Sequence, residues 1–408
     1  MGCNMNNNTM RALSASTLFV FSSITASALA ASPDNGDRVL SDDYTVSDFS
    51  AQSAGKILKK TSVENKYEIT NADKVYKVIY TATDGVNGKV RVNSGIIFLP
   101  AGEAPENGWP LVSWQHGTTG TADNCAPSWI GPDQPSKVVI SSWLAAGYAV
   151  VAPDYQGLGT PGIHPYLEPK PLAYSVLDLL KASLAANLGL QNSIVLHGWS
   201  EGGAATIATA LYAPQYAPAL HITGASSSGA PYVTFKTLSF LESDKTDPAA
   251  VVSYVTYLLN SVSQQGVTIP ADDVFSPDGK EFVKTYGHYC LDDLFREAKV
   301  NKAELKEIIN TKAFGNKLLI ERTEYPALKT KIPLFLSIGG GDIDVPTNMQ
   351  LALQQKMCAD GVDLSYKVYS AADHTDTLLE SIEETIVFLS QTLQKTESSA
   401  SNALRCQN

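Results

Sequence analysis

Charge is scarce in this sequence, and basic residues are scarcer than acidic ones. Only 17% of the 408 residues are charged, and 30 Lys and Arg stand against 41 Asp and Glu, which gives a net charge of −11. A surface of this sign repels phosphate backbones, so we expect no nucleic-acid partner. With 44% hydrophobic residues the chain can still bury a large core, which argues against a disordered protein.

Long apolar runs are absent as well. Residues 12–25 are apolar or small, but this run is too short and too rich in Ser and Thr to span a bilayer, which takes about 20 apolar residues. The run follows Arg11 and leads into Ala28-Leu29-Ala30, so residues 1–30 have the pattern of a secretory signal peptide. We expect cleavage near Ala30, an extracellular or periplasmic location, and no transmembrane segment.

Motifs for metals and cofactors are missing. The sequence has no H-E-x-x-H and no C-x-x-C, and Gly157-Leu158-Gly159 does not continue with the spacing of a dinucleotide-binding fingerprint. We therefore expect neither a metal nor a cofactor.

Cysteine is also rare, and its pattern indicates disulfides. Of the five cysteines, Cys3 falls in the expected signal peptide. The other four are Cys125, Cys290, Cys358 and Cys406. An even set in an oxidising compartment predicts two disulfides, and the residues by themselves leave all three pairings open.

Short apolar runs alternate with helical stretches along most of the chain. A strand hairpin is expected first, over residues 75–99. Further strands are expected at residues 110–114, 148–152, 193–196, 333–338 and 364–369, with helices at 135–146, 171–187, 201–213, 347–359 and 375–394. Apolar strands separated by helices predict an α/β fold, whose mostly parallel sheet is covered by helices on both faces.

One region breaks this alternation. Residues 232–325 contain helix candidates at 249–259, 291–299 and 302–310, and no clear core strand. Because structureless loops of this length are rare, we interpret the region as a helical cap or lid inserted into the core. Two ordinary crossover helices with long loops are the alternative. The core would then comprise residues 31–231 and 326–408.

The segment Gly198-Trp199-Ser200-Glu201-Gly202 is a G-x-S-x-G motif, which by itself is a weak signal. Its context is stronger, because an expected strand ends just before it and an expected helix follows. That setting is typical of a nucleophile elbow, in which Gly198 and Gly202 make room for a strained backbone. We predict that Ser200 is a nucleophile and that the N–H of Glu201 stabilises an oxyanion.

A serine nucleophile needs a base and an acid, and both are expected after the serine in the chain. Only His374 follows the last expected sheet strand, whereas the other two histidines after Ser200 lie in an apparent strand and in the inserted region. The acid should follow the strand at 333–338, where a glycine-rich loop offers Asp342 and Asp344. We predict His374 as the base and prefer Asp342 as the acid, with Asp344 as the alternative.

A second oxyanion donor is expected in the loop after the strand at 110–114. This loop reads Gln115-His116-Gly117-Thr118-Thr119-Gly120, and a His-Gly loop at this place commonly supplies the donor. Gly117 and Thr118 are the candidates, and an ordinary glycine-rich turn is the alternative.

Several segments together carry a family resemblance. They are Ser94-Gly95-Ile96, residues 115–118, residues 125–128, residues 154–159, residues 198–203, residues 342–346 and His374. In this combination the chain, from about Tyr67 onward, resembles the secretory lipase family of α/β-hydrolases, the Candida antarctica lipase A type. The resemblance implies an α/β-hydrolase fold with a helical cap, and ester hydrolysis through a Ser-Asp-His triad and an acyl-enzyme.

The resemblance also bears on two open choices. It aligns Asp342 with the acid of the triad. It suggests a bridge between Cys125 and Cys290 that ties the cap to the core, which leaves Cys358 and Cys406 as the second pair.

We therefore expect a secreted carboxylic-ester hydrolase, a lipase or esterase, that acts on a lipid or another ester. It should work as a monomer and touch lipid interfaces only transiently. A serine peptidase or transacylase on the same fold is one alternative, although the chain lacks the large gating domain expected of such a peptidase. A non-catalytic binding protein on a hydrolase scaffold is another, against which the intact Ser, Asp and His argue. The shape of the cap decides which ester reacts, so the sequence leaves the substrate open.

Overall fold

The computed structural model describes residues 37–394, with gaps at 47–48, 50, 65, 243–245, 265–268 and 311–316, and residues 403–406. The expected signal peptide and its cleavage site near Ala30 lie outside the described residues. Within them, no helix is both long and apolar enough to cross a membrane.

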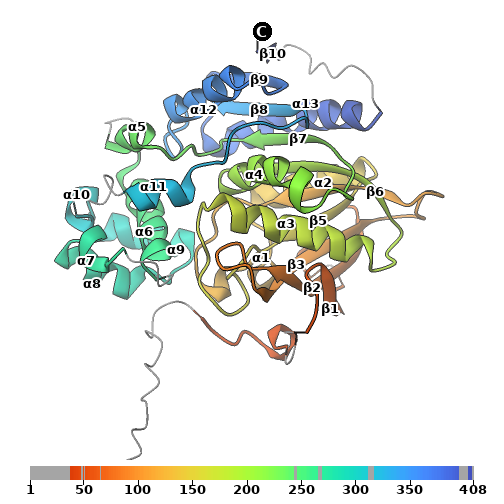
Figure 1. The fold of residues 1–408 in the computed structure, drawn as a ribbon, viewed down its shortest axis with the longest axis horizontal. Coiled ribbons are helices and arrows are strands. Elements are labelled where there is room, and N and C mark those ends of the chain that lie inside the picture. The colour runs from red at the N-terminus through yellow and green to blue at the C-terminus, as the bar shows by residue number, and fades with distance from the viewer. Residues whose placement is uncertain are drawn as a thin grey trace, which may run out of the picture. The chain divides into compact units, whose positions relative to one another are not determined.

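A mixed sheet of ten strands forms the centre of the described chain (Figure 1). The strands are β1 (Lys56–Ser62), β2 (Ala72–Thr83), β3 (Val90–Pro100), β4 (Trp109–Gln115), β5 (Ala149–Pro153), β6 (Leu190–Trp199), β7 (Ile222–Ser228), β8 (Leu334–Gly339), β9 (Leu364–Tyr369) and β10 (Leu404–Arg405). Their order is β1-β2-β3-β5-β4-β6-β7-β8-β9-β10. The strands β4 to β9 pair in parallel, while β1, β2, β3 and β10 pair antiparallel. The expected sheet, mostly parallel behind an antiparallel hairpin, is confirmed.

Burial explains which strands could be predicted from the sequence. Every residue of β5 and of β8 is buried, and apart from Ser337 in β8 both strands are apolar, as parallel strands between two helix layers are. The strand β1 was not expected. It lies at the edge of the sheet and none of its residues is fully buried, so it shows no apolar pattern.

Helices cover both faces of the sheet. They are α2 (Gln134–Ala145), α3 (Pro169–Leu184), α4 (Glu201–Tyr216), α12 (Thr347–Ala359) and α13 (His374–Gln394), with the short α1 (Pro127–Ile130), η1 (Asp42–Tyr44) and η2 (Asp123–Cys125) at loops. Residues of α2 and α13 pack in one apolar cluster with Val112, and residues of α3, α4 and α12 pack in another with Leu111. Neighbouring residues of a strand point to opposite faces, so the two clusters lie on the two sides of the sheet.

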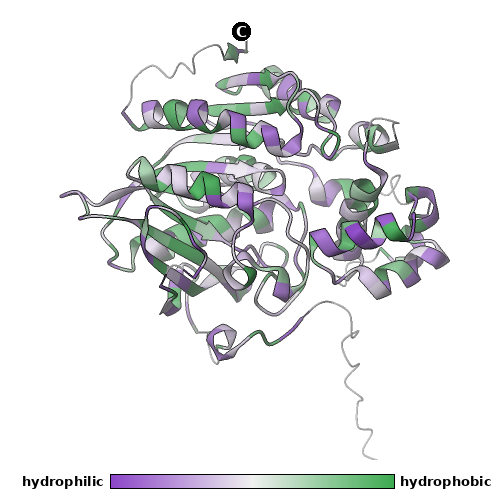
Figure 2. Ribbon diagram, turned by 180° about the vertical axis from the view of Figure 1, so that it is seen from behind, coloured by the Kyte–Doolittle hydropathy of each residue, from purple (hydrophilic) through white to green (hydrophobic). Residues whose placement is uncertain are grey.

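The segment between β7 and β8 is helical in its described residues. It contains α5 (Phe235–Leu238), η3 (Ser239–Glu242), α6 (Pro248–Gln264), α7 (Ala271–Val274), α8 (Pro277–Tyr286), α9 (Leu291–Val300), α10 (Leu305–Ile308) and α11 (Lys317–Thr323). Figure 2 shows green and purple alternating along helices, as in amphipathic helices. The expected helix at 302–310 is wrong in extent. Lys302 has a φ of 49°, which interrupts a helix, and Ile309 forms an isolated bridge with Phe275.

Two disulfides link distant parts of the chain. Cys125, at the end of η2, is bonded to Cys290, the residue before α9. Cys358 of α12 is bonded to Cys406, next to β10. The first is the pair that the family resemblance suggested, and the second is the pair that this choice leaves. The first bond joins the helical segment to a loop of the core, and the second holds the last described residues against the sheet.

Candidate active site

Ser200 lies at the sharp turn between β6 and α4, with backbone angles φ 58° and ψ −123°. A positive φ is strained for a residue other than glycine. The two flanking glycines make the turn possible: a Cβ atom on Gly198 would lie 2.1 Å from the carbonyl oxygen of Gly202, and one on Gly202 would lie 1.9 Å from that of Gln115. The Ser200 N–H donates to the carbonyl oxygen of Ser228 at 2.9 Å, which fixes the turn to β7. The serine is thus held at the carboxyl ends of the parallel strands.

His374 and Asp342 come together at the same end of the sheet. His374 is the first residue of α13, and Asp342 lies in the loop after β8. The Nδ1 atom of His374 lies 2.7 Å from Oδ2 of Asp342, and both side chains are buried. Asp344, the alternative acid, contributes its backbone N–H to Oδ1 of Asp342 at 3.0 Å. Asp342 is therefore the carboxylate that faces the imidazole.

Further donors hold Asp342 in place. The N–H of Val345 donates to Oδ1 at 2.9 Å, and the amide of Gln350 donates to Oδ2 at 2.8 Å. Gln350 also donates to the carbonyl oxygen of Val345 at 2.7 Å. No pattern in the sequence marks Gln350 for this role, since a glutamine inside an expected helix carries no such signal.

The charges around His374 favour its protonated form. Burial by itself lowers the pKa of His374, but the charge and hydrogen bond of Asp342, with Asp344 and Asp373, outweigh burial and raise the pKa above its usual value. The Nε2 atom is buried and has no hydrogen-bond partner among the described residues. His374 and Ser200 line the same cleft, so the Nε2 atom can receive a proton there.

Trp199 fixes the histidine from the side of the elbow. Its indole N–H donates to the carbonyl oxygen of His374 at 3.0 Å, and the two ring centres lie 5.1 Å apart. Trp199, the residue before Ser200, thus holds the backbone of His374 in place.

The predicted oxyanion donors surround Ser200. Among the described residues, the backbone N–H groups of Glu201, Gly117 and Thr118 donate to no protein acceptor. Glu201 begins α4, where the helix dipole also favours negative charge. A Cβ atom on Gly117 would lie 3.5 Å from Cβ of Ser200, so this loop passes close to the serine.

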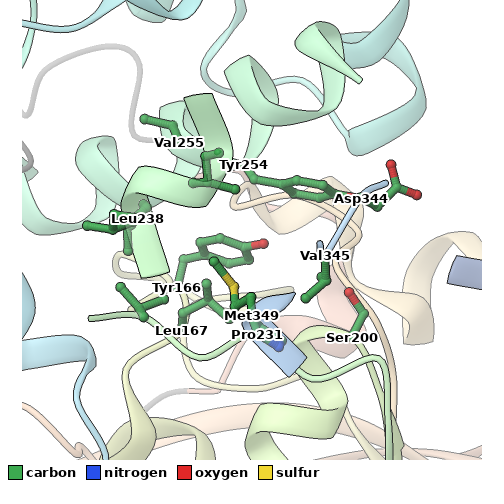
Figure 3. Close-up of a pocket in the computed structure, with 13 residues that line it drawn as sticks. Tyr166, Leu167, Ser200, Pro231, Leu238, Tyr254, Val255, Asp344, Val345 and Met349 are labelled. Carbon is green, nitrogen blue, oxygen red and sulfur yellow. The ribbon is translucent and has the colours of Figure 1, made fainter. Parts of the chain in front are cut away.

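Two cavities meet at Ser200. The first is apolar and includes Leu238, Val255 and Met349 in its wall, as Figure 3 shows for the labelled residues. Its space, including the open mouth, measures about 510 Å³. The second is a wider cleft of about 1790 Å³, which His374 and several aspartates line. Ser200 therefore lines both an apolar cavity and a wider cleft of mixed polarity.

Glu201 and His164 form a contact that the sequence analysis missed. The Nε2 atom of His164 lies 2.8 Å from Oε1 of Glu201, and both side chains are fully buried. From the sequence, Glu201 is predicted to act only through its backbone N–H, and His164 is not among the predicted site residues. The two residues are 37 positions apart, so no local pattern links them.

No group of three or more His, Cys, Asp or Glu residues that could hold a metal ion occurs in the described part of the chain.

Comparisons with known proteins agree on one family. A model of the family described as secretory lipase matches residues 133–400. The chain is 25% identical to lipase A of Moesziomyces aphidis over 378 residues, which cover 86% of this chain and 79% of that protein. It is 31% identical over 185 residues to a protein of Mycobacterium tuberculosis named a probable inactive lipase, a match covering 42% of this chain and 40% of that one.

The fold also matches a solved structure. Candida antarctica lipase A superposes with a TM-score of 0.72 at 21% identity, covering 91% of this chain and 88% of that one. At this identity the likeness establishes the α/β-hydrolase fold alone.

Proposed function

The chain belongs to the secretory lipase family and is a hydrolase of the lipase or esterase kind; from this we propose that it cleaves carboxylic esters through an acyl-enzyme on Ser200. One observation carries the proposal. His374 bonds Asp342 through Nδ1, and its Nε2 atom, in the cleft that contains Ser200, has no hydrogen-bond partner among the described residues. That is the arrangement in which a histidine can take a proton from a serine hydroxyl.

In the first step, the Ser200 oxygen attacks the ester carbonyl carbon while its proton moves to Nε2 of His374. The imidazolium that forms lies 2.7 Å from the Asp342 carboxylate, which stabilises the new positive charge. Asp342 also holds the hydrogen on Nδ1, so that Nε2 is the atom with the free lone pair.

The carbonyl oxygen becomes an oxyanion, and backbone donors stabilise it. We assign these donors to Glu201 and to Gly117 or Thr118, whose N–H groups have no protein acceptor among the described residues. Fixed donors of this kind are worth most where negative charge develops, because they need no reorganisation during the reaction.

The tetrahedral species then collapses. The bond to the alcohol oxygen breaks, His374 returns its proton to that oxygen, and the acyl group stays on Ser200. A water molecule next gives a proton to Nε2 and attacks the acyl carbonyl, and the same donors hold the second oxyanion. The bond between the acyl carbon and the Ser200 oxygen then breaks, Nε2 returns its proton to that oxygen, and the carboxylic acid leaves.

The two cavities suggest how the ester lies. We place the acyl chain in the apolar cavity with Leu238 and Met349, and the alcohol part in the wider cleft with His374, whose wall is partly polar. A lipid or another carboxylic ester fits this division. The helices between β7 and β8 supply part of the apolar wall, so we propose residues 232–325 as the cap, between core segments 31–231 and 326–408.

The location of the protein can be inferred from its family and its disulfides. Family membership and the two disulfides point to an oxidising compartment, extracellular or periplasmic. We propose that residues 1–30 are removed there, and that the enzyme acts as a monomer that touches lipid interfaces transiently.

A chromogenic ester assay on the purified protein tests the function. Ser200→Ala should abolish turnover and labelling by a fluorophosphonate probe, while its melting temperature stays near that of the wild type. Because one relative is named inactive, labelling of the wild type is the decisive result. A wild-type chain that neither reacts with the probe nor cleaves any ester would refute the proposal.

A further inference from the structure

His164 and Glu201 form a pair that is not part of the triad. One of its members, Glu201, supplies a proposed oxyanion donor through its backbone N–H. The Nε2 atom of His164 lies 2.8 Å from Oε1 of Glu201, and its Nδ1 atom lies 2.8 Å from the carbonyl oxygen of Gln156. Neither side chain is exposed. The second carboxyl oxygen of Glu201 is buried and has no hydrogen-bond partner among the described residues.

These contacts determine how many protons the pair holds. A carbonyl oxygen can only accept, so Nδ1 of His164 must carry a hydrogen. Nε2 then either donates to a Glu201 carboxylate or accepts from a protonated Glu201 carboxyl group. In both arrangements the pair has one proton more than a neutral imidazole and a carboxylate would have together. The net charge of the pair is therefore zero in both. The pair is thus a neutral unit that shares one proton.

Neutrality matters because of where Glu201 lies. Its backbone N–H is a proposed donor to the oxyanion, and an unpaired carboxylate on the same residue would add negative charge beside the one that develops. Charges interact strongly in a buried site, where water does not screen them. His164 removes this conflict.

The pair also connects the two sides of the proposed oxyanion hole. Tyr166, two residues after His164, places its hydroxyl 2.7 Å from Oγ1 of Thr118, and its N–H donates to the His164 carbonyl oxygen at 2.9 Å. The same N–H lies 3.1 Å from Oγ of Ser261 on α6. Contacts therefore run without a break from Glu201 through His164 and Tyr166 to Thr118.

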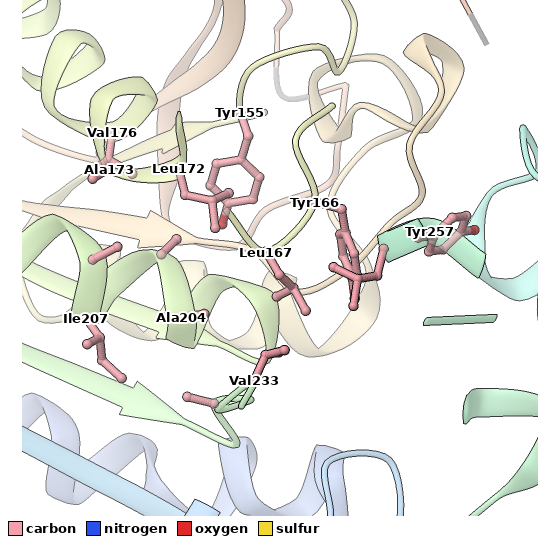
Figure 4. Packing of buried hydrophobic residues seen from close by; sticks show 14 of the residues in the cluster. Tyr155, Tyr166, Leu167, Leu172, Ala173, Val176, Ala204, Ile207, Val233 and Tyr257 are labelled. Carbon is pink, nitrogen blue, oxygen red and sulfur yellow. The ribbon is translucent and has the colours of Figure 1, made fainter. Parts of the chain in front are cut away.

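The surroundings leave the shared proton in the pair. Figure 4 shows Tyr155 and Tyr166 near α4, with Tyr257 on α6 beyond. Burial is the largest cause that raises the pKa of each of these three phenols well above its usual value, so all three stay neutral. His116 stacks on Tyr155 with ring centres 4.4 Å apart.

We propose that His164 and Glu201 are positioning residues, whose neutral, proton-sharing hydrogen bond holds the oxyanion donors of Glu201 and Thr118 at the separation that the transition state requires. This inference rests on the proposed function. It predicts an effect on the chemical step rather than on substrate binding, because the oxyanion exists only after the attack.

Two substitutions separate the hydrogen bond from the volume of the side chain. Glu201→Gln keeps the shape and can donate an amide hydrogen to Nε2 of a neutral His164. Glu201→Leu fills a similar space and leaves Nε2 without a partner.

Asp178→Asn is the matched control. Asp178 is also a fully buried carboxylate, and it accepts from the hydroxyl of Tyr216 at 2.8 Å. Tyr216 is the last residue of α4, roughly 22 Å along the helix from Glu201.

The test measures kcat and KM on a chromogenic ester, together with the inhibition constant of an alkylboronic acid, whose adduct with a serine mimics the oxyanion. Relative to wild type, Glu201→Leu should lower kcat about 10- to 100-fold, while KM stays within about twofold. The inhibition constant of the boronic acid should rise by a factor similar to the loss in kcat. Glu201→Gln should stay within about threefold, and Asp178→Asn should keep its kcat. Melting curves verify that each variant is folded at the assay temperature, and Glu201→Met replaces the Leu variant if that one is not.

Three results would overturn the inference: a wild-type kcat in Glu201→Leu, a loss in Glu201→Gln as large as in Glu201→Leu, or an equal loss in Asp178→Asn. Failure of the proposed function looks different, since the wild type would then cleave no ester at all.

Discussion

Replacing Asp342 by asparagine should abolish most of the activity, and the contacts of Asp342 explain how. Oδ1 accepts the N–H groups of Asp344 and Val345 at 3.0 and 2.9 Å, so the amide oxygen of the new side chain would take this place. The new amide NH₂ must then face Nδ1 of His374 and meet the Gln350 amide, which is also a donor. Nδ1 would have to accept, and the hydrogen would move to Nε2. In that tautomer the histidine cannot take the serine proton.

The size of the effect follows from the charge that is lost. Two unit charges about 4 Å apart at an effective dielectric constant of about 20 attract each other by about 4 kcal/mol. At about 1.36 kcal/mol for each factor of ten, loss of this attraction slows the reaction about 10³-fold. The wrong tautomer adds to this, so we expect kcat to fall about 10³- to 10⁴-fold.

The matched substitution is Asp344→Asn, two residues away in the same loop. Its backbone N–H to Oδ1 of Asp342 remains, so we expect kcat to fall less than about tenfold. Both variants are compared with wild type on the same chromogenic ester, with melting temperatures as a check of folding. Equal losses in the two variants, or an Asp342→Asn enzyme within tenfold of wild type, would refute the assignment of the acid.

Further predictions concern pH, stability and acyl length. Because the neighbouring carboxylates raise the pKa of His374, activity should fall as the pH drops through that value, and the acid limb of a kcat/KM profile should have its midpoint above about 6.5; a lower midpoint contradicts this. Replacing Cys125 and Cys290 together by Ser should cost about 2–5 kcal/mol of the free energy of unfolding, seen by calorimetry as a lower melting temperature, and an unchanged one would show that the bond adds nothing. Met349→Trp should lower kcat/KM for long acyl esters more than for acetyl esters, because Met349 lines the apolar cavity; equal losses across the series would place the acyl chain elsewhere.

The parts of the fold that the sequence predicted are those whose residues repeat a local rule. Buried parallel strands such as β5 and β8 are almost entirely apolar, and the elbow at Ser200 needs glycines at fixed spacing. The edge strand β1 obeys no such rule, because its pattern of exposure does not alternate cleanly. The helix expected at 302–310 followed local composition, whereas the backbone at Lys302 and the bridge at Ile309 are set by packing within the inserted segment.

The residues of the candidate site differ in the same way in how far the sequence predicts them. The place of His374 after the last parallel strand could be predicted from chain order. The residues alone favoured Asp342 but left Asp344 as the alternative, since both stand in one loop. The choice depends on which carboxylate receives the loop's own N–H groups. The pairing of His164 with Glu201 depends on a loop that folds back onto α4, and no spacing in the sequence records that contact.

The two edges of the sheet are protected from self-association by different means. At one edge, β1 carries Lys56, Lys59 and Lys60, whose charges discourage a second copy from adding a strand. At the other, β10 covers part of β9, and the bond between Cys358 and Cys406 keeps that short strand in place. A reducing environment would release it and open β9 as a template for intermolecular pairing. The colloidal stability of the protein therefore depends on the redox state of its surroundings at one edge and on salt at the other, because salt screens lysine charges.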